Sequence, residues 1–131
     1  MILVDTSVWI DFVRGRATEA VARLREVLDR GLGACLTSMI YQEILQGADS
    51  ERAFRDFCVF FSGQRFLHPV DPVTSHENAA RLYFECRRKG LTIRTNDCLI
   101  AQIAIEQGVP LLHDDRDFES IASVAPALKL S

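Results

Sequence analysis

The chain has 131 residues, 48% of them hydrophobic and 25% charged, with 15 basic and 18 acidic side chains and a formal net charge of −3. This length and composition predict one globular domain spanning residues 1–131 and exclude disordered, collagen-like and coiled-coil chains, while the net acidity argues against a generic nucleic-acid binder. The longest unbroken apolar run, residues 57–61, is far shorter than the roughly 18–20 residues that span a membrane, so we expect no membrane association.

The first half of the chain predicts two strands, each followed by two helices. Residues 2–4 are a short apolar run typical of a buried strand, and Asp5, Thr6 and Ser7 follow it directly. In chain order, we expect a strand at 2–4, helices at 8–13 and 18–30, a strand at 33–36, and helices at 39–46 and 50–61. Thr37 and Ser38 are suited to cap the helix at 39. One helical stripe is predicted to be core: Phe54, Phe57, Cys58 and Phe61.

The second half continues the alternation. A brief strand at 66–67 is followed by a helix at 74–89, for which Thr74 and Glu77 form a predicted capping box. The next helix, 95–107, is apolar almost all round, which predicts a central buried helix. A strand at 111–113 and a short helix at 117–123 complete the pattern. This order predicts an α/β fold with a short central parallel sheet flanked by helices.

The cysteines and histidines show no metal-binding spacing. The four cysteines lie far apart among apolar residues, with no C-x-x-C pair, and the three histidines do not complete a ligand set. A zinc site and a disulfide framework are therefore not expected. We predict reduced, buried thiols in a cytoplasmic protein without an export signal: Cys35, Cys58, Cys86 and Cys98.

Acidic residues stand at the ends of the predicted elements. Asp5 follows the first strand, Asp115 follows the last, Asp97 lies in the first turn of the buried helix, and Glu43 lies within the helix 39–46. Ligands of open α/β sheets bind beyond the carboxyl ends of the strands. Singly, each residue could be a helix cap, a partner of a helix dipole or a solvated side chain. Together, four converging carboxylates indicate a divalent cation, and their all-oxygen chemistry favours Mg²⁺ or Mn²⁺.

Four motifs in order carry a resemblance to a known family. They are Val-Asp-Thr-Ser-Val-Trp at 4–9, Tyr-Gln-Glu-Ile-Leu-Gln-Gly at 41–47, Arg-Thr-Asn-Asp-Cys-Leu-Ile-Ala at 94–101 and His-Asp-Asp-Arg-Asp-Phe at 113–118. Over essentially its whole length the chain resembles PIN-domain proteins, and more narrowly the VapC toxins of bacterial toxin–antitoxin pairs. The resemblance implies a PIN-like three-layer sandwich and a metal-dependent endoribonuclease toxin that is inhibited by a cognate antitoxin.

The resemblance also implies roles for individual residues. The catalytic, metal-binding carboxylates fall on Asp5, Glu43, Asp97 and Asp115, with Asp117 at an acidic position that only some members use. Thr6 and Ser7 would orient these carboxylates, Ser7 being the better match to the family's hydroxyl. The implied cofactor is Mg²⁺ or Mn²⁺, as one or two ions.

An arginine-rich stretch and several apolar residues are the candidate contacts for partners. Arg94, three residues before Asp97, is the best candidate to bind the substrate phosphate, followed by Arg87 and Arg88, although such a stretch could also be a solvated face. The resemblance further implies homodimers and an antitoxin groove formed by the helices around Glu43 and 50–61. We expect exposed Met39, Ile40 and Phe60 in this groove, with simple core packing as the alternative.

Other functions remain to be weighed against the enzyme. A PIN-like binding module acting only through its protein partner would carry the same fold without catalysis. A phosphoryl-transfer domain using Asp5 is disfavoured, because the second acid expected two residues later is Ser7. The sequence does not indicate which RNA is cut.

Overall fold

Four short parallel strands form the centre of the computed structural model, which describes residues 1–131. They are β1 (Ile2–Val4), β2 (Ala34–Leu36), β3 (Arg65–Phe66) and β4 (Leu111–Leu112), and they lie in the order β3-β2-β1-β4. In the register of this sheet, Leu3 pairs with Cys35 on one side and with Leu111 on the other. The inner strands are apolar at every position because helices cover both faces of the sheet.

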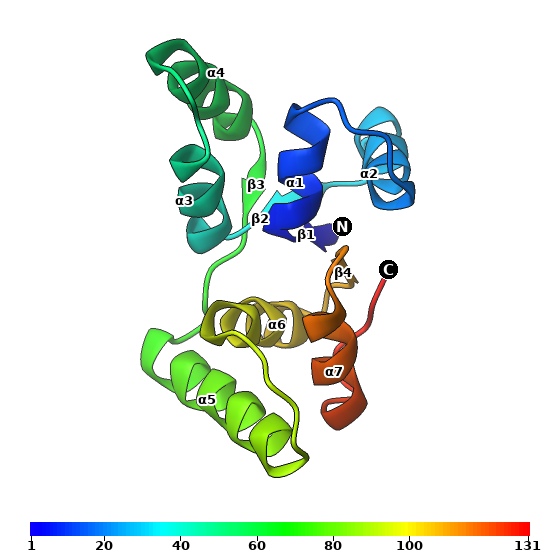
Figure 1. Cartoon of the computed structure of the whole chain (residues 1–131), viewed down its shortest axis with the longest axis vertical. Helices are drawn as coiled ribbons and strands as arrows, with labels where there is room; N and C mark the ends of the chain where they lie inside the picture. The colour runs from blue at the N-terminus through cyan, green and yellow to red at the C-terminus, as the bar shows by residue number, and fades with distance from the viewer.

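Seven helices form two layers on opposite sides of the strands (Figure 1). One layer holds α1 (Thr6–Val13), α2 (Glu19–Asp29), α3 (Ser38–Gln46) and α4 (Glu51–Ser62). The other holds α5 (Pro72–Arg88), α6 (Thr95–Gln107) and α7 (Arg116–Val124). This arrangement confirms the predicted three-layer α/β fold. None of the helices has the length and apolar character required to traverse a membrane.

The core is built around α6 and an aromatic cluster on the opposite layer. Most of the α6 side chains are buried, as its apolar composition predicted, and Gly108 ends the helix in the left-handed conformation that glycine adopts without strain. In the other layer, the Trp9 ring packs edge-on against Phe61 at 5.0 Å, and both side chains are fully buried. The two layers therefore bury apolar surface against the same short sheet.

Three local predictions are wrong. Helix α5 begins at Pro72, because the Asp71 side chain accepts a hydrogen bond from the Thr74 backbone N–H; Thr74 is thus inside the helix and forms no capping box. In the predicted core stripe of α4, Phe54 is 44% exposed. Cys58 is only partly buried, so three of the four predicted buried cysteines are confirmed; all four thiols are free.

Candidate metal centre

The sheet places two carboxylates next to each other. Asp5 follows β1 and Asp115 follows β4, and these strands are neighbours. The Asp5 backbone N–H donates to the Leu112 carbonyl at 2.9 Å, which continues the ladder one residue beyond the end of β1. Both residues also cap helices: Asp5 accepts from the Ser7 N–H at the start of α1, and Asp115 accepts from the Asp117 N–H at the start of α7. Helix capping and metal binding are therefore compatible at these residues, because the capping hydrogen bonds also orient the carboxylates.

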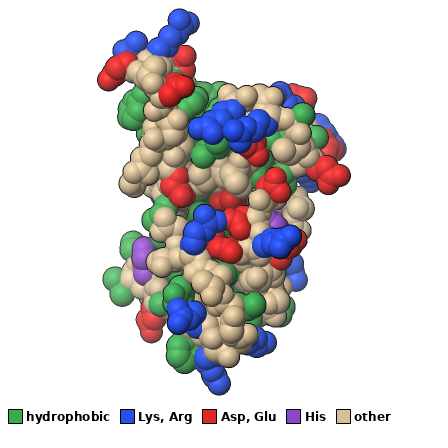
Figure 2. Space-filling view, in the orientation of Figure 1, with side chains coloured by type: hydrophobic (Ala, Val, Ile, Leu, Met, Phe, Trp, Pro, Cys, Tyr) green, Lys and Arg blue, Asp and Glu red, His purple; other side chains and the backbone are tan.

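Three aspartates form the tightest acidic cluster. Asp97, Asp115 and Asp117 each offer a carboxylate oxygen, and these atoms all lie within 4.8 Å of one another. Asp97 projects from the first turn of α6, and Asp117 from the first turn of α7. Figure 2 shows acidic side chains gathered near the middle of the face in view, with basic side chains beside them. The structure therefore brings together three of the five predicted metal-binding residues most closely, including Asp117.

Asp5 and Glu43 lie beside these aspartates, Asp5 at the end of β1 and Glu43 on α3 of the other helical layer. Together with Arg94, Asp97 and Asp115 they line a cavity of about 220 Å³. The Ser7 hydroxyl donates to Asp5 Oδ2 at 2.9 Å, and the Thr6 hydroxyl donates to Glu43 Oε1 at 2.9 Å. The two hydroxyls predicted to orient carboxylates, both at the start of α1, therefore each bind a different carboxylate.

Burial makes the ionised aspartates costly. Asp97 is 6% exposed, and burial, followed by a hydrogen bond with the Asp117 carboxyl, raises its pKa from 3.8 to about 7 against the opposing pull of Arg94. Desolvation also raises the pKa of Asp5, while the Ser7 hydrogen bond lowers it. Desolvation therefore outweighs the dipole of α6, which favours an ionised carboxylate in the first turn of the helix. The cluster therefore carries negative charge that its surroundings do not fully stabilise.

Arg94 supplies the basic side chain in this cluster. Its Nε lies 3.2 Å from Asp97 Oδ2 and 3.4 Å from Asp117 Oδ2, and its Nη2 contacts Asp115 Oδ2. Arg87 and Arg88 are exposed at the end of α5 and are not among the residues lining the acidic cavity. The Arg87 guanidinium lies over the Tyr83 ring, and that of Arg88 lies over Phe84.

The residues predicted to form one partner groove lie in three different environments. Ile40 is fully buried, so its predicted exposure is wrong: it faces the core, while its neighbour Met39, about 100° further round the helix, lines a pocket. Phe60 is 38% exposed and packs against Trp9 and Phe12 in the aromatic cluster. Met39 and Phe60 therefore belong to separate surfaces.

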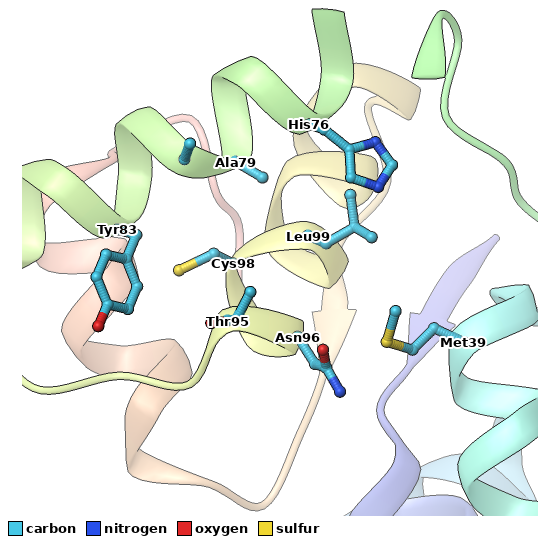
Figure 3. A pocket seen from close by; sticks show the side chains of 9 residues that line it. Met39, His76, Ala79, Tyr83, Thr95, Asn96, Cys98 and Leu99 are labelled. Atoms are coloured by element: carbon cyan, nitrogen blue, oxygen red, sulfur yellow. The ribbon is translucent and has the colours of Figure 1, made fainter. Parts of the chain in front are cut away.

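Sequence reasoning missed an apolar pocket beside the acidic site. This pocket, of about 320 Å³, lies between α5, α6 and the start of α3 (Figure 3). Four of its residues recur at i, i+3, i+4 and i+7 along α5, a helical stripe that could have revealed it: His76, Ala79, Ala80 and Tyr83. Thr95 and Asn96 line its other wall and immediately precede Asp97 in sequence.

Comparisons with known proteins give consistent matches over nearly the whole chain. A family model for the PIN domain matches residues 2–124. The chain is 35% identical over 126 residues to VapC ribonuclease Mb1587 of Mycobacterium bovis and to ribonuclease VapC11 of Mycobacterium tuberculosis, with 95% of this chain and 93% of each relative covered.

Two solved structures share the fold at low sequence identity. VapBC2 from Rickettsia felis, bound to a DNA fragment from its promoter, matches with a TM-score of 0.75 at 21% identity, covering 100% of this chain and 98% of the other. VapBC-1 from nontypeable Haemophilus influenzae matches with a TM-score of 0.74 at 19% identity, covering 100% and 97%.

Proposed function

The chain belongs to the PIN-domain family, and on this premise we propose that it is an endoribonuclease toxin of the VapC type that hydrolyses phosphodiester bonds in RNA under the control of an antitoxin. The observation that carries this proposal is the convergence of Asp97, Asp115 and Asp117 at the edge of the sheet that also presents Asp5. The alignment with the ribonuclease relatives covers more than nine-tenths of this chain, so the proposed activity belongs to the whole domain rather than to a fragment of it.

The residues present fit a hard divalent cation. All the side chains offered are carboxylates, and Asp97 Oδ2 is a buried oxygen without a hydrogen bond of good geometry. We propose that Mg²⁺ or Mn²⁺, as one or two ions, is held by Asp97, Asp115 and Asp117, with Asp5 and Glu43 completing the site. When bound, the ion supplies charge neutralisation at the phosphate and an activated water.

The chain's own residues hold these carboxylates in place. Ser7 and Thr6 each donate a hydroxyl hydrogen bond, to Asp5 and Glu43, and thereby restrict carboxylates that would otherwise rotate. The buried α6 anchors Asp97 to the core. Because strands and buried helices carry most of the site, its geometry depends on the core more than on loops.

Arginines near the site are the proposed contacts for RNA. Arg94 reaches the carboxylate cluster and is 69% exposed, so its guanidinium lies where a substrate phosphate would approach. Arg87 donates to the Tyr83 hydroxyl at 3.2 Å. Because Tyr83 lines the apolar pocket together with Thr95 and Asn96, Arg87 lies beside that pocket. Arg88 is paired with Glu85 and is proposed only as a peripheral contact.

Two separate apolar surfaces suit two protein partners. We propose that the antitoxin covers the α4 face, where Val59 is 74% exposed beside Phe60, and that protomers pair as homodimers through the pocket face of α5 and α6. The two surfaces belong to opposite helical layers, so both partners could bind together (Figure 1). Ala80→Arg should then give a monomer in light scattering after gel filtration; an unchanged mass would remove α5 from the dimer contact.

An RNA substrate and four free thiols support a cytoplasmic location.

The decisive test compares two adjacent aspartates. Asp115 lies in the cluster, whereas Asp114 is exposed and does not line the acidic cavity. With Mn²⁺ or Mg²⁺, purified protein should cleave RNA, Asp114→Asn should retain this activity, and Asp115→Asn and Asp97→Asn should lose it while remaining folded. EDTA should abolish cleavage by the unmodified protein. Equal activity of the two neighbouring variants would contradict the site, and absence of both cleavage and metal-dependent stabilisation would favour a non-catalytic binding module.

A further inference from the structure

The Arg94 guanidinium contacts the same three carboxylates that the metal centre would use. Its nitrogens lie against Oδ2 of Asp97, Asp115 and Asp117, and its backbone N–H donates to Asp117 Oδ2 at 3.3 Å. These three residues are the ones whose carboxylate oxygens lie within 4.8 Å of one another. One basic side chain thus spans the whole acidic cluster.

Arg94 and a divalent cation cannot both occupy this position. Each would bind the same three carboxylates, and two cations at such short separation repel strongly in a partly buried site. We propose that Arg94 is an internal counter-ion: it competes with the divalent ion for these aspartates and swings outward when the ion binds. This inference rests on the proposed function, because it concerns the same metal centre.

The position of Arg94 allows this exchange. Its side chain is 69% exposed although the Asp97 side chain that it contacts is only 9% exposed, so the guanidinium can return to water without opening the core. The exchange replaces one positive charge by two at a cluster of three aspartates. Once outside, the guanidinium is free to bind a phosphate, so Arg94 can act on the substrate only after the metal has displaced it.

The chain offers a matched control for the loss of charge. Arg116 lies between Asp115 and Asp117 in sequence, is exposed, and forms no ion pair in the structure. Arg94→Gln and Arg116→Gln remove the same charge close to the same site, but only the first removes a side chain that contacts the proposed ligand carboxylates. A general electrostatic effect would appear in both variants, whereas direct competition would appear in one.

The test measures Mn²⁺ binding directly, by the loss of the free-ion electron paramagnetic resonance signal, on folded protein without RNA. We expect R94Q to bind Mn²⁺ roughly tenfold or more tightly than the unmodified protein, and R116Q to differ by no more than about threefold. R94K keeps the charge but has one nitrogen in place of a two-nitrogen fork, so its affinity should fall between the two. Should R94Q fail to fold, R94K compared with R116K gives the same contrast.

The outcomes separate this inference from the proposed function. If the unmodified protein binds Mn²⁺ and cleaves RNA but R94Q binds Mn²⁺ no more tightly than R116Q, Arg94 is not a competing counter-ion and the nuclease assignment is untouched. If R94Q binds Mn²⁺ more weakly, Arg94 supports the metal and the inference is overturned. If the unmodified protein neither binds Mn²⁺ nor cleaves RNA, both proposals fall.

Discussion

Replacing Asp97 by asparagine should stabilise the protein when no metal is present. Asp97 is 6% exposed, and its pKa is raised from 3.8 to about 7. A difference of this size between the folded and unfolded states corresponds to a penalty on the order of 4 kcal/mol for the ionised folded form at pH 8. Asparagine has no charge to desolvate, but its amide still needs hydrogen bonds and it loses the attraction of Arg94. We therefore expect a gain of about 2 kcal/mol in the free energy of unfolding, or roughly 7 °C in Tm for a chain of this length.

The dependence of this effect on pH gives it a distinctive signature. A carboxyl whose pKa is raised on folding binds more protons in the folded than in the unfolded state, so the unmodified protein loses stability as the pH rises from about 4 to about 7. Asp97→Asn lacks this loss. The advantage of the variant should therefore be largest at pH 8 and should shrink towards pH 4.

Urea denaturation followed by circular dichroism, with EDTA at pH 8 and pH 5, measures both quantities. Saturating Mn²⁺ at pH 8 should reverse the order, because the unmodified protein gains binding energy that the variant largely lacks. A variant that is less stable than the unmodified protein at pH 8 in EDTA would refute the reasoning. A stability difference that is the same at both pH values would show that the Asp97 carboxyl does not titrate as the structure implies.

Three further predictions concern residues around the site and the core. Ser7→Ala removes the hydroxyl that holds Asp5 and should lower metal affinity or RNA cleavage by about 10–100-fold, measured by metal titration, while thermal stability changes little. Ser75→Ala should lower the free energy of unfolding by about 1–3 kcal/mol in urea, since the buried Ser75 hydroxyl donates to Glu106 at 2.8 Å. In the folded protein at pH 8, a thiol reagent should label Cys58 first, because the other three thiols are buried; fast labelling of more than one thiol would show that the core opens.

Sequence reasoning located the carboxylates because strand ends and a buried helix are visible in the apolar pattern. Asp5 and Asp115 follow apolar runs, and two parallel strands present their carboxyl ends at the same edge. Asp97 was placed because α6 is apolar on nearly all sides, which only a central helix tolerates. These signals depend on the spacing of apolar residues along the chain, which can be read directly from the sequence.

The errors arose where two nearby residues could fill one role, and one contact was not predicted because a long side chain can pair with several partners. Met39 and Ile40 are both apolar and adjacent at the start of a helix, and only the packing decides which one faces the core. Asp71 and Thr74 are both good caps, and Pro72 at the first helical position settles the choice in favour of Asp71. The pairing of Arg94 with three aspartates depends on the meeting of α6 and α7, which local pattern does not reveal.

The pairing of β1 with β4 has a consequence for the order in which the acidic cavity can form during synthesis. Leu3 pairs with Leu111, and the carboxylates of Asp5 and Asp115 meet only once these distant strands have joined. A ribosome releases the chain from its first residue onward, so β4, Asp115 and Asp117 leave the exit tunnel well after Asp5 and Glu43. A growing chain therefore carries Asp5 and Glu43 without the aspartates that share their cavity, and the cavity can form only after β4 and the start of α7 have emerged.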